Sequence, residues 1–399
     1  MLAGTDPSTR HPDTACAMAP MHHRAWLSGP VRGNMPAAQP AQCRADLHRE
    51  PALSRLPSLS LRAVAASLLL AALPLTCAVA AKPSAARPVK VMIITMFGPE
   101  AAPWLARLGP TQALPVPGLS ADYPEVRCTA AGVCLMTTGM GHANAAASTL
   151  ALALSPKLDL THAYFVVTGI AGIDPNVGTL GAAAWARYLV DFGLQQEFDA
   201  REAPSAWPTG YVGIGAADPA TKPKLEYATE VFQLDEALLQ RALALSRDAR
   251  LDDSEAAAAY RKQYPQAAAQ AAPGVLQCDT LGGDTWWHGQ RLGERAEAWT
   301  RLLTDGKGTY CTTQQEDNAT YEALRRGAAA GRLDLHRVAV LRTGANFDRP
   351  HPGQTAQESL NALSGGFPIS TANLVHAAWP LVSDIVTRWP QWREGVPRQ

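Results

Sequence analysis

A run of polar side chains separates a predicted strand from a predicted helix at residues 312–318 (TTQQEDN). A carboxylate in such a run can accept hydrogen bonds from two neighbouring sugar hydroxyl groups at once. Glu316 is therefore our candidate ribose-binding residue. The alternative is that Asp317 or Asn318 caps the helix predicted from Ala319, because short polar side chains satisfy the free amides of a first turn. Capping alone does not explain the preceding Gln and Glu residues, so both interpretations stand.

A second polar segment follows the last predicted strand, at residues 342–351 (RTGANFDRPH). An Asn or Asp within hydrogen-bond reach of a purine N7 atom can stabilise the base as negative charge develops on it. Asn346 is our candidate for this catalytic and base-binding role. The alternative is that Asp348 and Arg349 form a surface loop and that His351 has no chemical role.

Two adjacent tryptophans follow a glycine pair in the segment 282–288 (GGDTWWH). Exposing two neighbouring indoles to water is unfavourable. We therefore weigh two arrangements: one indole in the core with the other stacked on a planar base, or both indoles buried.

Two glycine-rich segments follow predicted strands, at residues 137–144 (TTGMGHAN) and 168–175 (TGIAGIDP). Glycine lets the backbone approach a ligand closely, and the helix predicted after the first segment presents free amides to oxygen-rich groups. The alternative for each is a tight connection without a ligand, with His142 in solvent and Asp174 capping a turn.

Strands and helices that alternate along the chain must position these segments. Apolar runs bounded by turn residues predict strands at 89–95, 126–128, 133–137, 164–168, 183–190, 274–278 and 338–343. Helical patterns cover 101–108, a stretch ending at 154, 230–247, 256–271, 319–330, 355–363 and 372–388. The alternation predicts an α/β fold with a mostly parallel sheet flanked by helices, in which ligands bind at the carboxyl ends of strands.

The charge balance of the 399-residue chain excludes several classes of partner. Lys and Arg together number 35, and Asp and Glu also number 35, so the formal net charge is zero. A nucleic acid or an anionic membrane surface would require a basic excess. We therefore expect no nucleic-acid partner and a small, neutral or weakly polar ligand.

The N-terminal region carries the pattern of an export signal. Arg55 and Arg62 precede an apolar run at 63–81, which ends in the small-residue sequence Ala78-Val79-Ala80. We expect residues 1–82 to comprise a disordered N-terminus and a signal peptide, and residues 83–399 to form a single domain. A membrane anchor is the alternative for the apolar run. The mature chain is then expected to have no membrane-spanning helix and to be periplasmic or secreted.

Four of the seven cysteines follow the predicted signal peptide: Cys128, Cys134, Cys278 and Cys311. An even number in an exported chain suggests disulfides. Cys128 and Cys134 flank a predicted hairpin turn, so we expect one bridge there and a second between Cys278 and Cys311. A metal site is the alternative, but the spacings match no zinc pattern, and we expect no metal.

The chain from about Lys90 to Pro397 resembles the purine nucleoside permease family. The most specific matching strings are CDTLGGDTWWHG, LGERAEAWTRLLTDGKGTYCTTQQEDNATYEAL and VLRTGANFDRPHPGQ. This family is in turn distantly similar to the nucleoside phosphorylase and nucleosidase superfamily. The resemblance implies a three-layer fold of that type, with a mostly parallel, mixed central sheet flanked by helices.

The resemblance to this superfamily also implies roles for individual residues. It suggests that Gly98 begins the phosphate or water site, that Trp286 stacks on the purine beside Asp284, and that Glu316 and Asn346 contact the ribose and N7. The two glycine segments match its ligand-binding turns and contribute Gly139, Gly141, Gly169 and Gly172.

Two departures from the phosphorylase pattern bear on the reaction. Val167 stands where a phosphorylase carries an arginine, and Ile170 stands where it carries a serine. Phosphate is therefore a doubtful co-substrate, and no other cofactor is expected. A hydrolase would require a carboxylate near the first strand exit, and Glu100 is the candidate there.

Three functions fit these observations. The first is a nucleoside-binding protein linked to transport, which would need a separate membrane transport partner. The second is an exported enzyme that cleaves the N-glycosidic bond of purine nucleosides, as a phosphorylase or a hydrolase. The third is a phosphorylase-like scaffold that binds without turnover. Because phosphorylase relatives complete their sites across subunits, a homo-oligomer is a further expectation.

Overall fold

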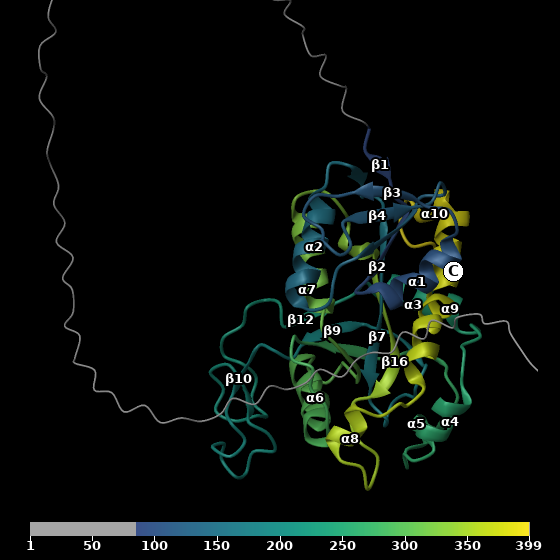
Figure 1. Ribbon diagram of the computed structural model, residues 1–399. Helices are drawn as coiled ribbons and strands as arrows, with labels where there is room; N and C mark the ends of the chain where they lie inside the picture. Colours follow the sequence, from purple (N-terminus) through teal and green to yellow (C-terminus); the bar gives the residue numbers. More distant parts are fainter. Residues whose placement is uncertain (1–84, 399) are drawn as a thin grey trace, which may run out of the picture. The chain divides into compact units, whose positions relative to one another are not determined.

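The computed structural model describes residues 85–398 (Figure 1). The predicted signal peptide lies outside the described residues. The strands are β1 (Arg87–Pro88), β2 (Val91–Thr95), β3 (Gln112–Pro115), β4 (Glu125–Cys128), β5 (Val133–Thr137), β6 (Leu158–Asp159), β7 (Tyr164–Ile173), β8 (Ala183–Trp185), β9 (Tyr188–Asp191), β10 (Gln195–Glu197), β11 (Tyr211–Gly213), β12 (Val231–Gln233), β13 (Val275–Gln277), β14 (Asp279–Gly282), β15 (Tyr310–Gln314) and β16 (Val338–Phe347). The helices are α1 (Gly98–Leu108), α2 (His142–Leu154), α3 (Glu236–Ser246), α4 (Glu255–Arg261), α5 (Ala267–Gln270), α6 (Gln290–Leu303), α7 (Asp317–Ala329), α8 (Ala356–Leu360), α9 (Gly366–Thr387) and α10 (Trp389–Trp392).

A mixed central sheet organises the described residues. Its main path runs in the order β12-β9-β14-β15-β7-β2-β5-β4-β3, while β16 pairs with β7 and β8, and β13 pairs with β8. The pairs of β2 with β5 and β7, of β16 with β7, and of β14 with β9 and β15 are parallel. Strands β15 and β7 pair in the antiparallel direction. The predicted α/β class with a mixed sheet flanked by helices is confirmed.

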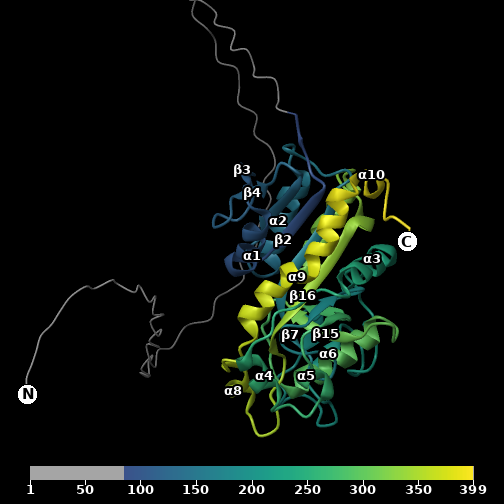
Figure 2. The same cartoon turned by 90° about the vertical axis from the view of Figure 1, so that its right-hand side faces the viewer.

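Both faces of the central strands are buried, and these strands supply side chains to both. In β2, Met92 and Ile94 belong to the cluster beneath α2 and α7, whereas Val91 and Ile93 belong to the cluster beneath α1, α3 and α9. Alternate residues of a strand point to opposite faces, so a continuous apolar run suits a sheet covered on both sides. Figures 1 and 2 show these helical layers, with α9 lying along β16.

Two strands extend further than the sequence pattern predicted. The prediction ended a strand at Thr168 and placed a turn at residues 169–172, but β7 continues through these residues to Ile173. Strand β16 likewise extends from the predicted end at Thr343 to Phe347. The two strands pair in parallel over this whole length, so their backbone hydrogen bonds override the weak strand preference of glycine.

Three predicted helices differ in their bounds. The pattern at 230–247 contains strand β12 before α3 begins at Glu236. The pattern at 256–271 divides into α4 and α5, on either side of Pro265, whose ring disrupts a helix interior. The last predicted helix, 372–388, is the C-terminal part of the longer helix α9.

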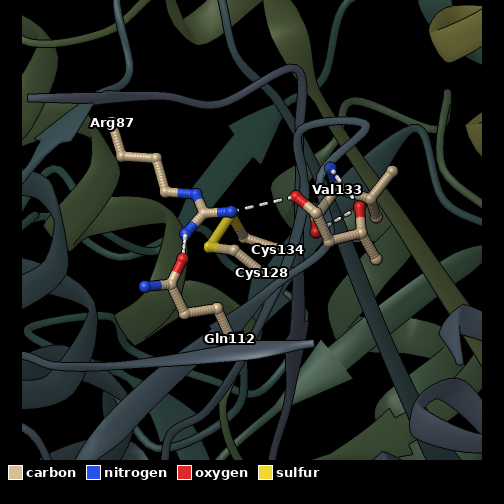
Figure 3. The surroundings of a disulfide bond; sticks show 6 residues. Arg87, Gln112, Cys128, Val133 and Cys134 are labelled. Atoms are coloured by element: carbon tan, nitrogen blue, oxygen red, sulfur yellow. Dashed lines mark hydrogen bonds between the residues drawn. A yellow bond between two sulfur atoms is a disulfide. The ribbon is translucent and has the colours of Figure 1, made fainter. Parts of the chain in front are cut away.

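Both predicted disulfides are present. Cys128 and Cys134 join β4 to β5, and Arg87 lies beside this bridge, where it donates to the side-chain oxygen of Gln112 (Figure 3). Cys278 and Cys311 form the second bridge, which ties the residue before β14 to strand β15. Strand β15 leads directly to the polar run that contains Glu316.

Candidate functional site

A cavity of about 790 Å³ lies at the carboxyl ends of the central strands. Five of the predicted site residues line it: Glu100, Gly172, Trp286, Glu316 and Asn346. They come from α1, β7, the loop after β14, the start of α7 and the end of β16. The fold therefore brings together side chains that lie more than 240 positions apart in the sequence, since Glu100 and Asn346 are the outermost pair.

Glu100 belongs to the first turn of α1 and is almost fully buried, with 1% of its surface exposed. Its carboxylate accepts hydrogen bonds from the backbone amides of Met96 and Ile170, both at 2.8 Å. Burial raises the pKa of Glu100 to about 7, although nearby Arg342 acts in the opposite direction. A carboxyl group with this pKa exchanges a proton near neutral pH, as an acid or base catalyst must.

Arg342 is the central charge of the cavity wall, and 1% of its surface is exposed. Its guanidinium makes a two-point contact with Asp317, at 2.5 and 3.0 Å, and contacts Glu316 at 3.2 Å. Burial alone would lower the pKa of Arg342, but the two carboxylates outweigh it and raise that pKa. This guanidinium is therefore a permanent cation that is already paired.

Glu316 is the N-cap residue of α7, yet its side chain makes no capping bond within that helix. One carboxylate oxygen, Oε1, accepts from the amide of Gly141 at 3.1 Å, and the other accepts from Arg342. The capping alternative for Asp317 or Asn318 was wrong, because both lie inside the helix, Asp317 binds Arg342, and Asn318 donates to the Thr229 carbonyl.

Asn346 reaches the cavity through an irregularity in β16. The pairing register with β7 shifts between Gly344 and Asn346, which pairs with Gly172. A bulge of this kind turns a side chain relative to its neighbours. The Asn346 amide nitrogen donates to the carbonyl of Phe347 at 2.8 Å, which leaves its oxygen and one N–H without a partner in the described chain.

The two adjacent tryptophans have different environments. Trp287 is buried among Phe192 and Tyr310, whereas Trp286 is 68% exposed at the rim of the cavity. The alternative with both indoles buried is therefore wrong, and stacking of Trp286 on a base stays a prediction. Trp286 is the indole with a face available to a ligand.

Five predicted site residues do not line the cavity: Gly98, Gly139, Gly141, Gly169 and Asp284. Gly98 donates its amide to the Tyr123 hydroxyl, and Asp284 accepts from the amide of His142 at 2.7 Å. A side chain at Gly169 would meet the Arg342 guanidinium. Gly141 donates its amide to Glu316, which does line the cavity.

The sequence pattern missed part of the rim. Residues 360–368 contribute several apolar side chains, of which Leu363 is 99% exposed. The signal in the sequence was the pair Gly365-Gly366, and Gly365 has a φ of +74°, which lets the chain turn into α9. Asp348 also lines the cavity, where it is fixed by Tyr310 and Arg349, both at 2.7 Å.

Two further findings apply to the described residues. Among residues 85–398, no helix is both long enough and apolar enough to cross a membrane. In the same range, no group of three or more His, Cys, Asp or Glu side chains is arranged to hold a metal ion.

A cavity of this size at strand ends, walled by buried carboxylates and an amide, is typical of α/β proteins that bind small molecules. The chain belongs to the purine nucleoside permease family, whose model matches residues 88–397. A probable purine nucleoside permease of Schizosaccharomyces pombe is 40% identical over 315 residues, which cover 76% of this chain and 90% of the relative. A purine nucleoside permease of Candida albicans is 40% identical over 320 residues, 79% of each chain.

Solved structures with similarity to the chain include two bacterial enzymes. The 5′-methylthioadenosine/S-adenosylhomocysteine (MTA/SAH) nucleosidase of Streptococcus pneumoniae, in complex with 8-aminoadenine, is 16% identical, with a TM-score of 0.44 over 73% of this chain and 99% of the enzyme. The futalosine hydrolase of Helicobacter pylori is 13% identical, with a TM-score of 0.45 over 74% of this chain and 98% of the enzyme.

Proposed function

We propose that the protein binds a purine nucleoside in this cavity, as a step in nucleoside uptake. Family membership supports the proposal, since the curated relatives are named purine nucleoside permeases. The observation that carries it is that Glu316, Asn346 and Trp286, from three separate segments, line one cavity. A carboxylate suits ribose hydroxyls, an amide suits a purine ring nitrogen, and an indole suits the face of a base.

The free hydrogen-bonding positions fit this ligand. Oε1 of Glu316 accepts one bond, from Gly141, and keeps a second lone pair for a ribose hydroxyl. Gly172 lies beside Asn346 and is closely packed, because a methyl group there would lie 2.9 Å from the Thr313 side chain. The proposed base lies against this bare backbone, with Trp286 over it.

Calorimetric titration of the purified full chain with inosine, guanosine and adenosine tests binding. Glu316→Gln should weaken affinity roughly 10- to 100-fold, because a hydrogen bond to a charged group contributes about 1.5–3 kcal/mol. Glu322→Gln is the matched control, since Glu322 lies on the same helix but outside this cavity. Equal affinity in the two variants, or no binding of any of the three nucleosides, contradicts the proposal.

A second candidate function is hydrolysis of the bond between ribose and base, and Glu100 is the observation that favours it. Its pKa of about 7 allows it to take a proton from water at neutral pH. The water oxygen then bonds to C1′ of the ribose as the bond from C1′ to the base nitrogen breaks. The base leaves with the electron pair and takes up a proton, while Asn346 stabilises its negative charge.

The charges on the cavity wall favour water over phosphate as the attacking group. The lining residues include three carboxylates, Glu100, Glu316 and Asp348, and the guanidinium of Arg342. Arg342 is already paired with Asp317, so it offers a phosphate little uncompensated positive charge. We propose that phosphate is not a co-substrate.

Incubating the purified protein with each nucleoside, with and without phosphate, separates these reactions. We expect free base to appear at the same rate in both conditions. Base that appears only with phosphate refutes hydrolysis. Binding without any release of base excludes both the hydrolase and the phosphorylase and is consistent with the uptake proposal. Asn346→Ala should lose turnover yet keep most of its affinity, because its proposed role is to stabilise the charge of the departing base.

We also propose that the protein is exported to the periplasm or secreted after cleavage of the segment at 63–81. Two buried disulfides support this, because such bonds persist in oxidising compartments. Cell fractionation followed by N-terminal sequencing should find a mature chain that begins near Ala81. A chain that stays in the cytoplasm with its N-terminus intact contradicts export.

Uptake by an exported binding protein requires a membrane partner that accepts the nucleoside, and we propose such a partner. Cross-linking in cells, with and without nucleoside, should capture an integral membrane protein in a ligand-dependent way. We further propose that the protein forms a homo-oligomer, which light scattering of the purified chain tests directly. A monomeric mass at all concentrations refutes the oligomer.

A further inference from the structure

We propose that Arg342 and Asp317 act together as the positioning pair of the site, holding Glu316 in place and controlling the charge of Glu100. The inference rests on the proposed nucleoside site. The ligand need not contact both residues of this pair. Arg342 lines the cavity, whereas Asp317 lies behind it and does not.

The contacts of Arg342 join three parts of the wall. The guanidinium donates to the carbonyl of Ile170 on β7 at 3.1 Å, and to Glu316 and Asp317 at the start of α7. Glu100 binds the amide of the same residue, Ile170, at 2.8 Å. One guanidinium thus fixes the segment that also fixes Glu100.

Asp317 determines how much of the Arg342 charge remains available. Its side chain is 0% exposed and its two oxygens contact the guanidinium at 2.5 and 3.0 Å. At that depth neither charge is screened by water, so each is felt strongly by its neighbours. Removing either one must change the electrostatic potential at the other buried carboxylates.

Few groups face Glu100, so the direction in which each variant shifts its ionisation can be worked out. Arg342 on β16 favours the ionised carboxylate, Glu316 at the start of α7 disfavours it, and the amides of Met96 and Ile170 favour it. Neutralising Asp317 leaves more of the Arg342 charge acting on Glu100, which favours ionisation. Neutralising Arg342 has the opposite effect.

Three variants test this pair in the full chain. Asp317→Asn keeps the shape of the side chain and removes its charge. Arg342→Gln removes the cation but leaves Asp317 buried and unpaired, which endangers folding. The double variant removes both charges of the pair, so that only Glu316, which keeps its bond from the Gly141 amide, loses a cationic partner. Asp334→Asn is the control, because Asp334 pairs with buried Arg337 at the opposite end of β16.

The readout is the titration of Glu100 itself, followed by NMR of carboxyl-labelled glutamate, with the Glu100 signal assigned by its loss in Glu100→Gln. In Asp317→Asn the midpoint should fall by about half a pH unit, a threefold change in proton affinity. In the double variant it should rise. The Asp334→Asn midpoint should match the wild type. The inference is overturned if the Glu100 midpoint is the same as in the wild type in both folded Asp317→Asn and the double variant.

The pH dependence of nucleoside affinity separates this inference from the proposed function. It should move in the same direction as the Glu100 midpoint in each variant. If the midpoints move as expected but the wild-type protein binds no nucleoside, the positioning pair stands and the proposed function fails. If nucleosides bind but the midpoints do not move, the positioning pair is refuted.

Discussion

Replacing Gly169 by alanine tests how rigidly the centre of the site is packed. A methyl group at this position would lie 2.4 Å from Nη1 of Arg342 and 3.0 Å from Oε1 of Glu100. The first distance is about 1 Å short of an ordinary contact. Arg342 cannot yield without losing its contacts to Asp317, because it is buried on all sides.

These contacts determine the expected loss of stability in Gly169→Ala. Overpacking a core costs about 1–3 kcal/mol, and breaking a buried ion pair costs about 3–5 kcal/mol. We therefore expect Gly169→Ala to lower the free energy of unfolding by about 3 kcal/mol, measured by urea denaturation with the disulfides intact.

The matched control for this substitution is Gly274→Ala. A methyl group at Gly274 would meet no atom within 4 Å. That variant should be neutral, or more stable by up to about 1 kcal/mol, because alanine restricts the unfolded chain. If Gly169→Ala unfolds at the same urea concentration as the wild type, Arg342 is not held as the contacts indicate.

Three further predictions concern stability and ligand contact. Burial raises the pKa of Glu100 from 4.5 to about 7, so between these pH values the folded chain holds a proton that the unfolded chain has released. The free energy of unfolding should therefore fall as pH rises through this window. In urea titrations at pH 5 and pH 8, Glu100→Gln should remove this pH dependence. Replacing Cys278 and Cys311 by serine opens a loop with a sequence separation of 33, which should lower the free energy of unfolding by about 3–4 kcal/mol. Trp286→Ala should weaken nucleoside affinity roughly 3- to 10-fold without loss of stability, whereas Trp287→Ala should cost about 3–5 kcal/mol in the same urea assay.

The strands of the fold were predictable because both of their faces are buried. The apolar runs of β2, β7 and β16 identified all three strands, and the glycine-rich segment that follows Thr168 was the main error. Local preference marks residues 169–172 as a turn, but β16 and β15 supply partners for that backbone. Pairing between segments so far apart in the chain cannot be read from a local pattern.

The candidate site was predictable where a single side chain carries the signal. Glu316 and Asn346 stand out as polar residues at strand ends, and both line the cavity. Arg342 was visible as a charge in an apolar strand, but its partner Asp317 was interpreted as a possible helix cap. The pair is separated by 25 positions and forms because the start of α7, which follows β15, lies against the middle of β16.

The same pair explains why an uncharged ligand suits this cavity. Arg342 would attract anions if it were free, yet Asp317 and Glu316 neutralise it, and Glu100 carries at most one further negative charge near neutral pH. Asp348 adds a carboxylate that Arg349 compensates from behind the wall. Hydrogen-bonding positions therefore remain in the cavity without a free cation among its lining residues. The proposed nucleoside ligand offers hydroxyls and ring nitrogens but no charge and would suit those positions, whereas the added phosphate of a nucleotide would meet carboxylates.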